Sequence, residues 1–484
     1  MSMKTLSNDF VFYGLLNFLQ RAIGIIMIPI YTRVLSQNEY GQLDIILIVS
    51  SVFCVLVDLQ FVVGFSRLYY QYKAAKKGER FAGTIVVSRL IGGIVLPVIF
   101  LIMGFLGKLE VSFLPSFKDN VGVWVLMCMS IPVTLTYEIM LLQVRMLRWK
   151  KWFAIGALSN CLLACLFSIF FVVGIKLGIV GVLLGLLLGK FIGLLLLSLG
   201  LCKDLKLCFD IKAFKELMHY SFPLIPGWWM AFGSAYLCRF FIFDTAGPSE
   251  NAILAVCMKL ASVIGFFNVS FQLAWQPLAM SYIERENSEQ FYVRSMRLFI
   301  AGGIFSVFCF SAFIGPLLKV FTPSAYSVVQ YYFPLFAIGS MLSGCANNLE
   351  IGNQIAKRTY LISISSFICV SINFIMLMIF TKRFGIIAAG IAWIISFFAK
   401  NVVMYITSQR SHYIAYDKRA FLLFIVGSGI LFFLVFCSYN NYITPWLFTS
   451  CVALISVILP WFVMVPLERQ KTSDILRLKL KNIF

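Results

Sequence analysis

The chain is a succession of apolar runs, each about twenty residues long and separated from the next by a short polar break. A helix of that length rises about 30 Å, the thickness of the hydrocarbon core of a bilayer. Hydrophobic residues make up 61% of the 484 residues and charged residues 12%. A typical soluble domain has about 45–50% apolar residues and about 25% charged residues. The mean hydropathy is +0.92. The sequence therefore predicts an all-α polytopic membrane protein.

Counting these runs predicts about fourteen transmembrane helices. We expect six in an N-terminal lobe (1–202), six in a C-terminal lobe (203–410), and two more helices and a basic cytoplasmic tail in 411–484. The fifth and sixth runs are separated only by Lys176 and Gly178. The runs lie near residues 10–30, 44–65, 84–106, 121–143, 153–174, 178–201, 221–243, 251–275, 298–321, 329–350, 361–380, 385–408, 420–438 and 446–465.

The distribution of Lys and Arg predicts the orientation. The formal net charge is +20, and most basic residues follow even-numbered runs, as in RLYYQYKAAKKGER at 67–80. By the positive-inside rule, both termini are cytoplasmic, and no nucleic-acid partner is needed to explain the charge. The apolar run at 10–30 is too long for a cleavable signal and lacks a cleavage pattern, so we expect it to remain in the protein.

Several kinds of site are excluded or disfavoured. Most of the 13 Cys lie inside apolar runs, where they pack as small hydrophobes, and the two His, His219 and His412, lie in loops. We therefore expect no disulfide framework, no metal site and no cofactor. The chain has no P-loop and no long hydrophilic stretch, so we expect neither an ATPase nor a soluble catalytic domain.

Ionisable residues inside the runs point to a cavity. Arg21 lies roughly 16 Å and Lys190 roughly 18 Å from the start of its run, too deep to reach the interface by snorkelling. For Arg89 and Arg239, nearer the ends, snorkelling or an internal ion pair remains open. Lys259 and Lys400 lie at intermediate depth, whereas Asp58, Glu138 and Glu350 lie toward the cytoplasmic ends. Because a lipid-facing charge costs roughly 2.5–3.5 kcal/mol, the excess of bases predicts a water-filled cavity that selects an anion.

Two local patterns add to this prediction. Asn17, Gln20 and Arg21 share one face of the first helix because they are three and four residues apart. Pro223 and Pro226 interrupt the backbone hydrogen bonds where the seventh run begins. Broken helices of this kind mark moving parts in transporters, although prolines that only shape packing would give the same pattern.

Three segments resemble the Wzx-type polysaccharide-transport flippases, a group that also contains lipid II flippases and MATE multidrug exporters. They are RAIGIIMIPIYTRVLSQNEYGQLDII, CRFFIFDTAGPSENAILAVCMKLASVIGFF and WQPLAMSYIERE. The resemblance implies two six-helix lobes in a V around a central cavity. It also implies that an undecaprenyl-pyrophosphate-linked oligosaccharide is flipped to the outer leaflet of a bacterial inner membrane. Basic residues are common in this family at the positions of Arg21 and Arg239. Many relatives place Asp before the second of these, where Cys238 stands here.

The sequence thus predicts alternating access without catalysis. Arg21 contacts the pyrophosphate, Arg239, Lys259 and Lys190 add positive charge, and Asn17, Gln20 and Trp228 meet the sugars. Membrane lipids, a counter-ion such as H⁺, Na⁺ or Cl⁻, and a glycan polymerase are the expected partners. Two alternatives remain. A MATE-like organic-cation exporter would need deep carboxylates. A membrane-embedded sugar transferase would need a close pair of carboxylates, which the sequence does not show.

We expect Arg21→Ala to abolish export of the surface glycan while the protein remains in the membrane, because removing an unpaired cation lowers the cost of insertion. Arg21→Lys should keep part of the activity, since the charge survives but the bidentate fork is lost, and Arg21→Glu should be at least as damaging as Ala. Complementation of glycan display, with the protein quantified in the same membranes, measures this. Normal export by Arg21→Ala, or loss of all three variants from the membrane, would contradict the counter-ion role.

Overall fold

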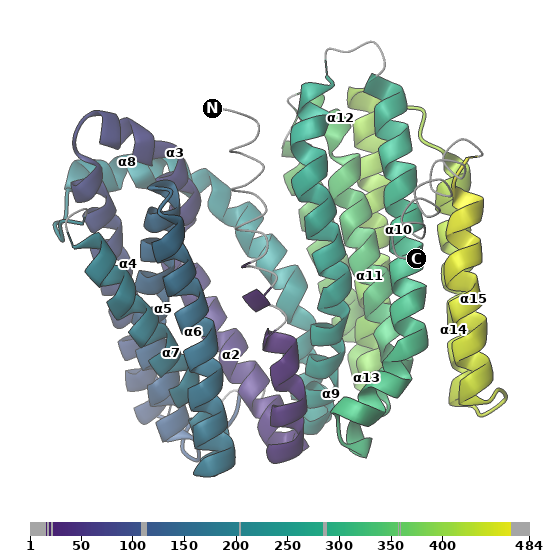
Figure 1. Cartoon of the computed structure of the whole chain (residues 1–484), viewed down its shortest axis with the longest axis horizontal. Helices are drawn as coiled ribbons and strands as arrows, with labels where there is room; N and C mark the ends of the chain where they lie inside the picture. The colour runs from purple at the N-terminus through teal and green to yellow at the C-terminus, as the bar shows by residue number, and fades with distance from the viewer. Residues whose placement is uncertain are drawn as a thin grey trace, which may run out of the picture. The chain divides into compact units, whose positions relative to one another are not determined.

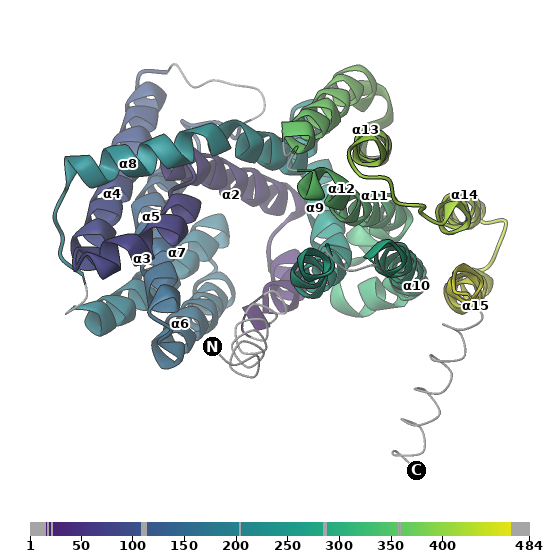
Figure 2. The same ribbon diagram turned by 90° about the horizontal axis from the view of Figure 1, so that it is seen from above.

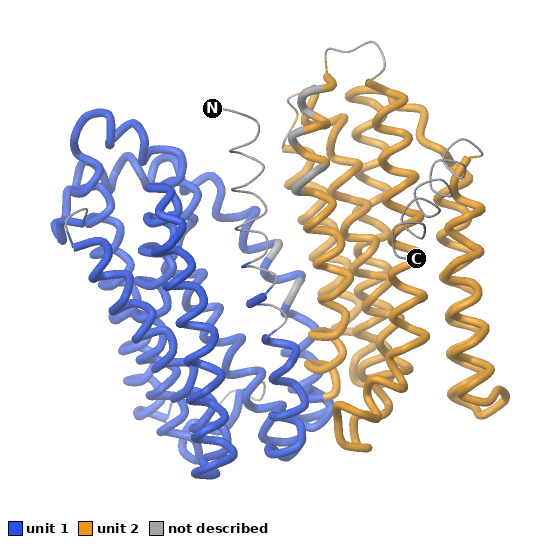
Figure 3. The backbone as a smooth tube through the Cα atoms, viewed as in Figure 1, with its two compact units in different colours: residues 1–252 blue, residues 253–484 orange. Residues whose placement is uncertain are grey.

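The computed structural model describes residues 16, 19–20, 23–107, 114–202, 205–283, 288–356, 358 and 360–465. In these residues all regular secondary structure is helical, and ten helices are long and apolar enough to cross a membrane. The chain is therefore a multi-pass membrane protein, as predicted. It forms two compact units, Met1–Ala252 and Ile253–Phe484, each of which is described by itself (Figure 3).

Unit 1 is built around four long helices, α4 to α7, which pack against one another (Figure 1). A short apolar helix, Ile23–Val34, precedes α2. The bounds are α2 (Gln37–Asp58), α3 (Phe61–Ala74), α4 (Gly78–Phe105), α5 (Val121–Met146), α6 (Lys150–Ile169) with the π-helical turn η1 (Phe170–Gly174), α7 (Gly178–Leu201), α8 (Ile211–Ser221), the 3₁₀ turn η2 (Phe222–Leu224) and the first part of α9 (Ile225–Ser281). The turn η2 contains Pro223, so the predicted break before the seventh run is confirmed.

Unit 2 is a second bundle, in which α11 packs against both α10 and α13, and α15 lies against α10 beside α14 (Figure 1 and Figure 2). Asp417 caps the start of α14, and Thr444 caps α15, whose first residue is Pro445. The bounds are the rest of α9, α10 (Ser288–Phe321), the 3₁₀ turn η3 (Ser324–Tyr326), α11 (Val329–Leu349), α12 (Ile351–Ile355), α13 (Tyr360–Ser411), α14 (Lys418–Tyr439) and α15 (Pro445–Val463).

Two very long helices bend at glycines. The backbone leaves the helical region at Gly247 in α9 (φ 86°) and at Gly385 in α13 (φ 52°), conformations that residues with a Cβ rarely adopt. These bends separate the runs predicted at 221–243 and 251–275 and those at 361–380 and 385–408. The predicted count of fourteen spans is consistent with this arrangement. The turn predicted at Lys176 and Gly178 is present between η1 and α7, and both residues have positive φ.

The second predicted span, 44–65, is not one straight helix. It breaks between α2 and α3, where Leu59 (φ 44°) and Gln60 (φ 62°) are both left-handed. Each costs about 1–2 kcal/mol because its Cβ approaches the following carbonyl oxygen. Ser221 of α8 donates a hydrogen bond from Oγ to the Gln60 carbonyl oxygen at 3.3 Å. The helix α8, which runs across the ends of α3 and α4 (Figure 2), thereby stabilises the break.

The helix α8 is anchored by a core at this end of unit 1. Its buried face carries Ala213 and Leu217, which belong to one hydrophobic cluster with Phe61 and Phe65 of α3 and Phe81 of α4. The opposite face is polar, as expected of a helix lying along a surface. The cluster fixes the position of α3 and so the position of the break that follows Asp58.

Glycines let α6 and α7 approach closely. Gly181, Gly185, Gly189 and Gly193 recur every fourth residue on α7 and are buried. A Cβ at Gly185 would lie 2.4 Å from the backbone nitrogen of Ser168, in α6. Stripes of small residues at this spacing bring membrane helices into close contact where no hydrophobic effect drives association.

We expect Gly185→Ala to lower the melting temperature of the detergent-purified protein, because the added methyl group overlaps backbone atoms that cannot move aside and such overpacking costs about 1–3 kcal/mol. Gly429→Ala in α14 is the matched control, since a Cβ there meets nothing within 4 Å. It should leave stability unchanged or raise it by up to about 1 kcal/mol through helix propensity. Equal melting temperatures for the two variants would show that α6 and α7 do not pack as described.

Candidate functional site

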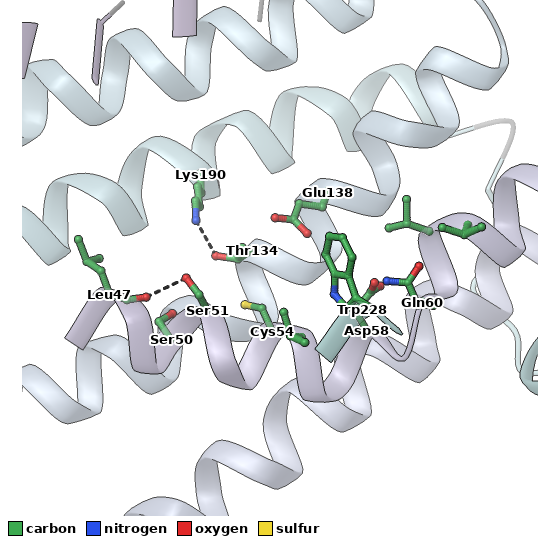
Figure 4. A pocket seen from close by; sticks show the side chains of 13 residues that line it. Leu47, Ser50, Ser51, Cys54, Asp58, Gln60, Thr134, Glu138, Lys190 and Trp228 are labelled. Carbon is green, nitrogen blue, oxygen red and sulfur yellow. Dashed lines mark hydrogen bonds between the residues drawn. The ribbon is translucent and has the colours of Figure 1, made fainter. Parts of the chain in front are cut away.

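Unit 1 contains a cavity of about 480 Å³ between α2, α5 and α7, with the first residues of α3 and α9 at its edge (Figure 4). The lining is partly apolar, and several polar side chains point into it from different helices. The polar or aromatic members are Ser50, Ser51, Asp58, Gln60, Thr134, Glu138, Lys190 and Trp228. Two residues predicted from the sequence, Lys190 and Trp228, therefore line the same cavity.

Lys190 lies on α7 and reaches the cavity from the middle of that helix. Its Nζ donates a hydrogen bond to Oγ1 of Thr134 on α5 at 2.9 Å, and its side chain is half-buried. One turn further along α5, Glu138 is exposed to the cavity (Figure 4). Lys190 thus lines this cavity, and its ammonium group is held by α5.

A buried ion pair supports the wall of this cavity. Arg89 of α4 is fully buried, pairs with the carboxylate of Asp58, and donates a hydrogen bond from Nη1 to the carbonyl oxygen of Leu135 at 3.0 Å. Arg89 also interacts electrostatically with Glu138. Of the two alternatives that the sequence left open for Arg89, the structure shows the internal ion pair and not snorkelling.

The charges around the cavity are more balanced than predicted. Among the described residues, Lys190 and Arg89 stand opposite Asp58 and Glu138, so the formal charges cancel. The prediction of a cavity lined by unpaired cations is not met by these four groups. Arg21, the other deep base of unit 1 in that argument, lies outside the described residues, as does Asn17.

Arg239 has an acidic partner that the sequence reasoning missed. Its Nη1 lies 2.6 Å from Oδ1 of Asp44 in α2, and the two side chains are only 12% and 4% exposed. Asn251 donates from Nδ2 to the carbonyl oxygen of Gly41 at 3.0 Å and lies 3.4 Å from Oδ2 of Asp44. Asp44 thus supplies the negative charge that Cys238, next to the arginine, does not.

The same region joins two polar breaks of the sequence. A Cβ on Gly41 would lie only 1.7 Å from the carbonyl oxygen of Pro248, so the start of α2 touches the backbone beside the Gly247 bend. The segments 31–46 and 243–256, each part of a family-like stretch, therefore meet at Gly41 and Pro248, both in unit 1. A glycine is required at position 41 because any side chain would collide with the Pro248 backbone.

The remaining predicted residues lie elsewhere. Gln20 donates a hydrogen bond from Nε2 to the carbonyl oxygen of Ala157 in α6 at 3.2 Å, so its amide is engaged by the backbone. Lys259 belongs to unit 2, where it is half-buried in α9. Lys400, also in unit 2, interacts electrostatically with Glu350. Arg239 is not part of the cavity lining.

Nothing in the described parts of the chain resembles a metal centre. No group of three or more His, Cys, Asp or Glu side chains in those residues could hold a metal ion. All thirteen cysteines are free thiols. The cavity lining offers charged, hydroxyl, amide, thiol and indole groups.

Comparison with known proteins gives one family. The family model described as "Polysaccharide biosynthesis protein" matches residues 6–283, more than half of the chain. This stretch includes unit 1 from residue 6 onward and every residue that lines the cavity. No curated protein sequence gives a significant match.

Solved structures with the same fold are membrane transporters. The lipid II flippase MurJ, in its inward closed conformation, superposes with a TM-score of 0.70 at 17% identity, covering 94% of this chain and 98% of that one. The eukaryotic MATE transporter AtDTX14 gives 0.59 at 13% identity, covering 85% and 96%. An inward-facing multidrug resistance MATE family transporter of the MOP superfamily gives 0.59 at 13% identity, covering 81% and 94%. The chain therefore has the fold of this superfamily, as predicted.

We expect Asp44→Asn and Arg239→Gln each to lower the stability of the purified protein by roughly 3 kcal/mol or more, because each leaves the opposite charge buried and unpaired. The double variant Asp44→Asn/Arg239→Gln should recover most of the loss. Thermal unfolding in detergent measures all three.

The control is the exposed pair of Lys206 and Glu79, 2.9 Å apart with 67% and 42% of the side chains exposed. Glu79→Gln should cost less than about 1 kcal/mol because water screens such a pair. Additive effects of the two buried substitutions would show that Asp44 and Arg239 do not act as a pair.

Proposed function

The chain belongs to the polysaccharide biosynthesis protein family, and we propose that it is a flippase for undecaprenyl-pyrophosphate-linked oligosaccharide repeat units. The cargo would be an O-antigen or capsule unit, carried from the inner to the outer leaflet of the bacterial cytoplasmic membrane. The family match carries this proposal. The likeness in fold to a protein named as a lipid II flippase supports transport of a lipid-linked cargo.

The cavity of unit 1 supplies groups suited to the polar part of such a cargo. Lys190 offers an ammonium group to a phosphate oxygen, and Thr134 holds that group in place through their hydrogen bond. Trp228 is 46% exposed and presents an aromatic surface at the cavity edge, where a sugar ring could pack. Transport by alternating access needs no covalent chemistry.

Arg21 is proposed as the main counter-ion of the pyrophosphate, on the argument from its depth in the first run. The roles proposed for Asn17, Gln20 and Lys259 remain predictions. Arg239 would have to leave Asp44 in order to bind cargo, so we assign it first to holding α2 against α9. The coupling ion, a glycan polymerase as partner and the cytoplasmic position of both termini also remain proposals.

One observation favours a second candidate. Asp58 and Glu138 line the cavity, and a MATE-like exporter of organic cations needs carboxylates in such a place. Asp58 is already paired with Arg89, so Glu138 is the carboxylate that a cationic cargo would meet. This reading would give Lys190 no role in cargo binding, because a cation would be repelled by it.

We expect Lys190→Ala to reduce display of the surface glycan at least tenfold, since the loss of one phosphate-binding charge removes on the order of 1.5–3 kcal/mol. Lys190→Arg should retain part of the activity because it keeps the charge. Lys319→Ala is the control, because Lys319 is exposed on α10 in the other unit. Glycan display and membrane protein level are measured in the same cells.

Normal export by Lys190→Ala would remove Lys190 from the site. Efflux of a lipophilic cation from cells that express the protein, abolished by Glu138→Gln and unaffected by Lys190→Ala, would replace the flippase proposal by the exporter.

A further inference from the structure

A second cavity lies in unit 2, in a place that the proposed transport of cargo does not use. It has a volume of about 710 Å³ and is formed by α11, α13 and α14. Its walls are almost entirely apolar, and Phe398, Val402, Leu422 and Ile425 are exposed along it. Sites for small ligands have volumes of about 300–1,000 Å³, so this one could hold part of an amphiphile.

One end of this cavity is basic. Lys418 and Arg419, the first two residues of α14, line it, and both side chains are exposed. Within the described residues neither side chain forms an ion pair. The neighbouring carboxylate of Asp417 is already engaged, since it lies 3.3 Å from Nη1 of Arg297 and accepts the backbone N–H of Arg419. Among the described residues, no Asp or Glu lines the cavity, so these two cations have no counter-charge in its wall.

Two residues of the lining also carry buried polar atoms. Oδ1 of Asn401 and the hydroxyl of Tyr416 are buried and have no hydrogen-bond partner among the described residues. The side chains are 8% and 7% exposed, and both line the cavity. These atoms are covered by the protein itself, so a ligand in the cavity is recognised by the apolar walls and the two cations.

We propose that this cavity binds an anionic glycerophospholipid of the inner leaflet. The acyl chain lies along Phe398, Leu422 and Ile425, the phosphate lies at Lys418 and Arg419, and the glycerol region lies near Tyr416. The distribution of positive charge predicts that the loop preceding α14 is cytoplasmic, and basic pockets between helices on that side of a membrane suit anionic headgroups. A zwitterionic lipid would gain the same apolar contact with less attraction, so headgroup selectivity is the signature of the site.

The test measures lipid binding alone and therefore stands apart from the flippase proposal. Full-length protein, purified in detergent and stripped of lipid, is titrated with phosphatidylglycerol or phosphatidylcholine of the same chain length, and bound lipid is counted by native mass spectrometry. We expect tighter binding of phosphatidylglycerol. The variant Lys418→Ala/Arg419→Ala should weaken phosphatidylglycerol binding about 25-fold, because each basic residue near an anionic headgroup is worth about a factor of five. Binding of phosphatidylcholine should change little.

The matched control is Lys382→Ala/Arg383→Ala, which removes another adjacent Lys–Arg pair, exposed on α13 and absent from the lining. This variant should bind phosphatidylglycerol as the wild type does. Ile425→Trp tests the apolar part of the cavity without a change of charge. It should weaken the binding of both lipids, because the larger side chain fills part of the cavity. Equal affinity of the wild type for the two lipids would overturn the proposal. So would equal losses in the two Lys–Arg variants, or displacement of phosphatidylglycerol by a polyprenyl phosphate that binds more tightly.

Discussion

Charge burial within helices that cross a membrane constrains unit 1 more than any other interaction. An unpaired charge in hydrocarbon costs several kcal/mol, and an irregular backbone there must be buried or face water. The described part of unit 1 meets both conditions around α2. Arg89 and Arg239 come from α4 and α9, and each is paired with a carboxylate of α2, Asp58 and Asp44. The two carboxylates lie fourteen residues apart, or about 21 Å along the helix. The helix α2 is therefore fixed by charge near both of its ends.

The same helix connects the cavity to two unusual stretches of backbone. At its start, Gly41 touches the carbonyl of Pro248 next to the bend at Gly247. At its end, Leu59 and Gln60 adopt left-handed conformations, and Ser221 of α8 binds the carbonyl group of Gln60. Between these points Ser50 and Ser51 line the cavity. A rotation of α2 would therefore alter the cavity wall, the contact at Gly247 and the break before α3 together.

Most of the fold could be predicted because the bilayer imposes a length on each helix and a pattern on its flanks. The bend at Gly247 and the turn at Lys176 fall between predicted runs, and the bend at Gly385 falls at the start of one, since polar residues, Gly and Pro mark such places. The break at Leu59 could not be predicted from the sequence, because neither Leu59 nor Gln60 favours a left-handed conformation. Only the packing of α8 accounts for this break. The partner of Arg239 was missed for another reason. Asp44 is 195 residues away from Arg239 in the chain. Because it stands at the start of a predicted run, the sequence did not distinguish it from a loop residue. Depth arguments identify which charges need a partner, as for Lys190, but they cannot say which helix provides it.

Charge balance decides which cargo the cavity can hold. Among the described groups, an anion that approaches Lys190 also meets Glu138, while Arg89 and Asp58 already neutralise each other in the wall. Its attraction to Lys190 is therefore largely offset by repulsion from the exposed carboxylate. Selectivity for a pyrophosphate needs one more positive charge, or the loss of one negative charge, in the same space. In the proposed function that positive charge comes from Arg21, the deep base of the first run.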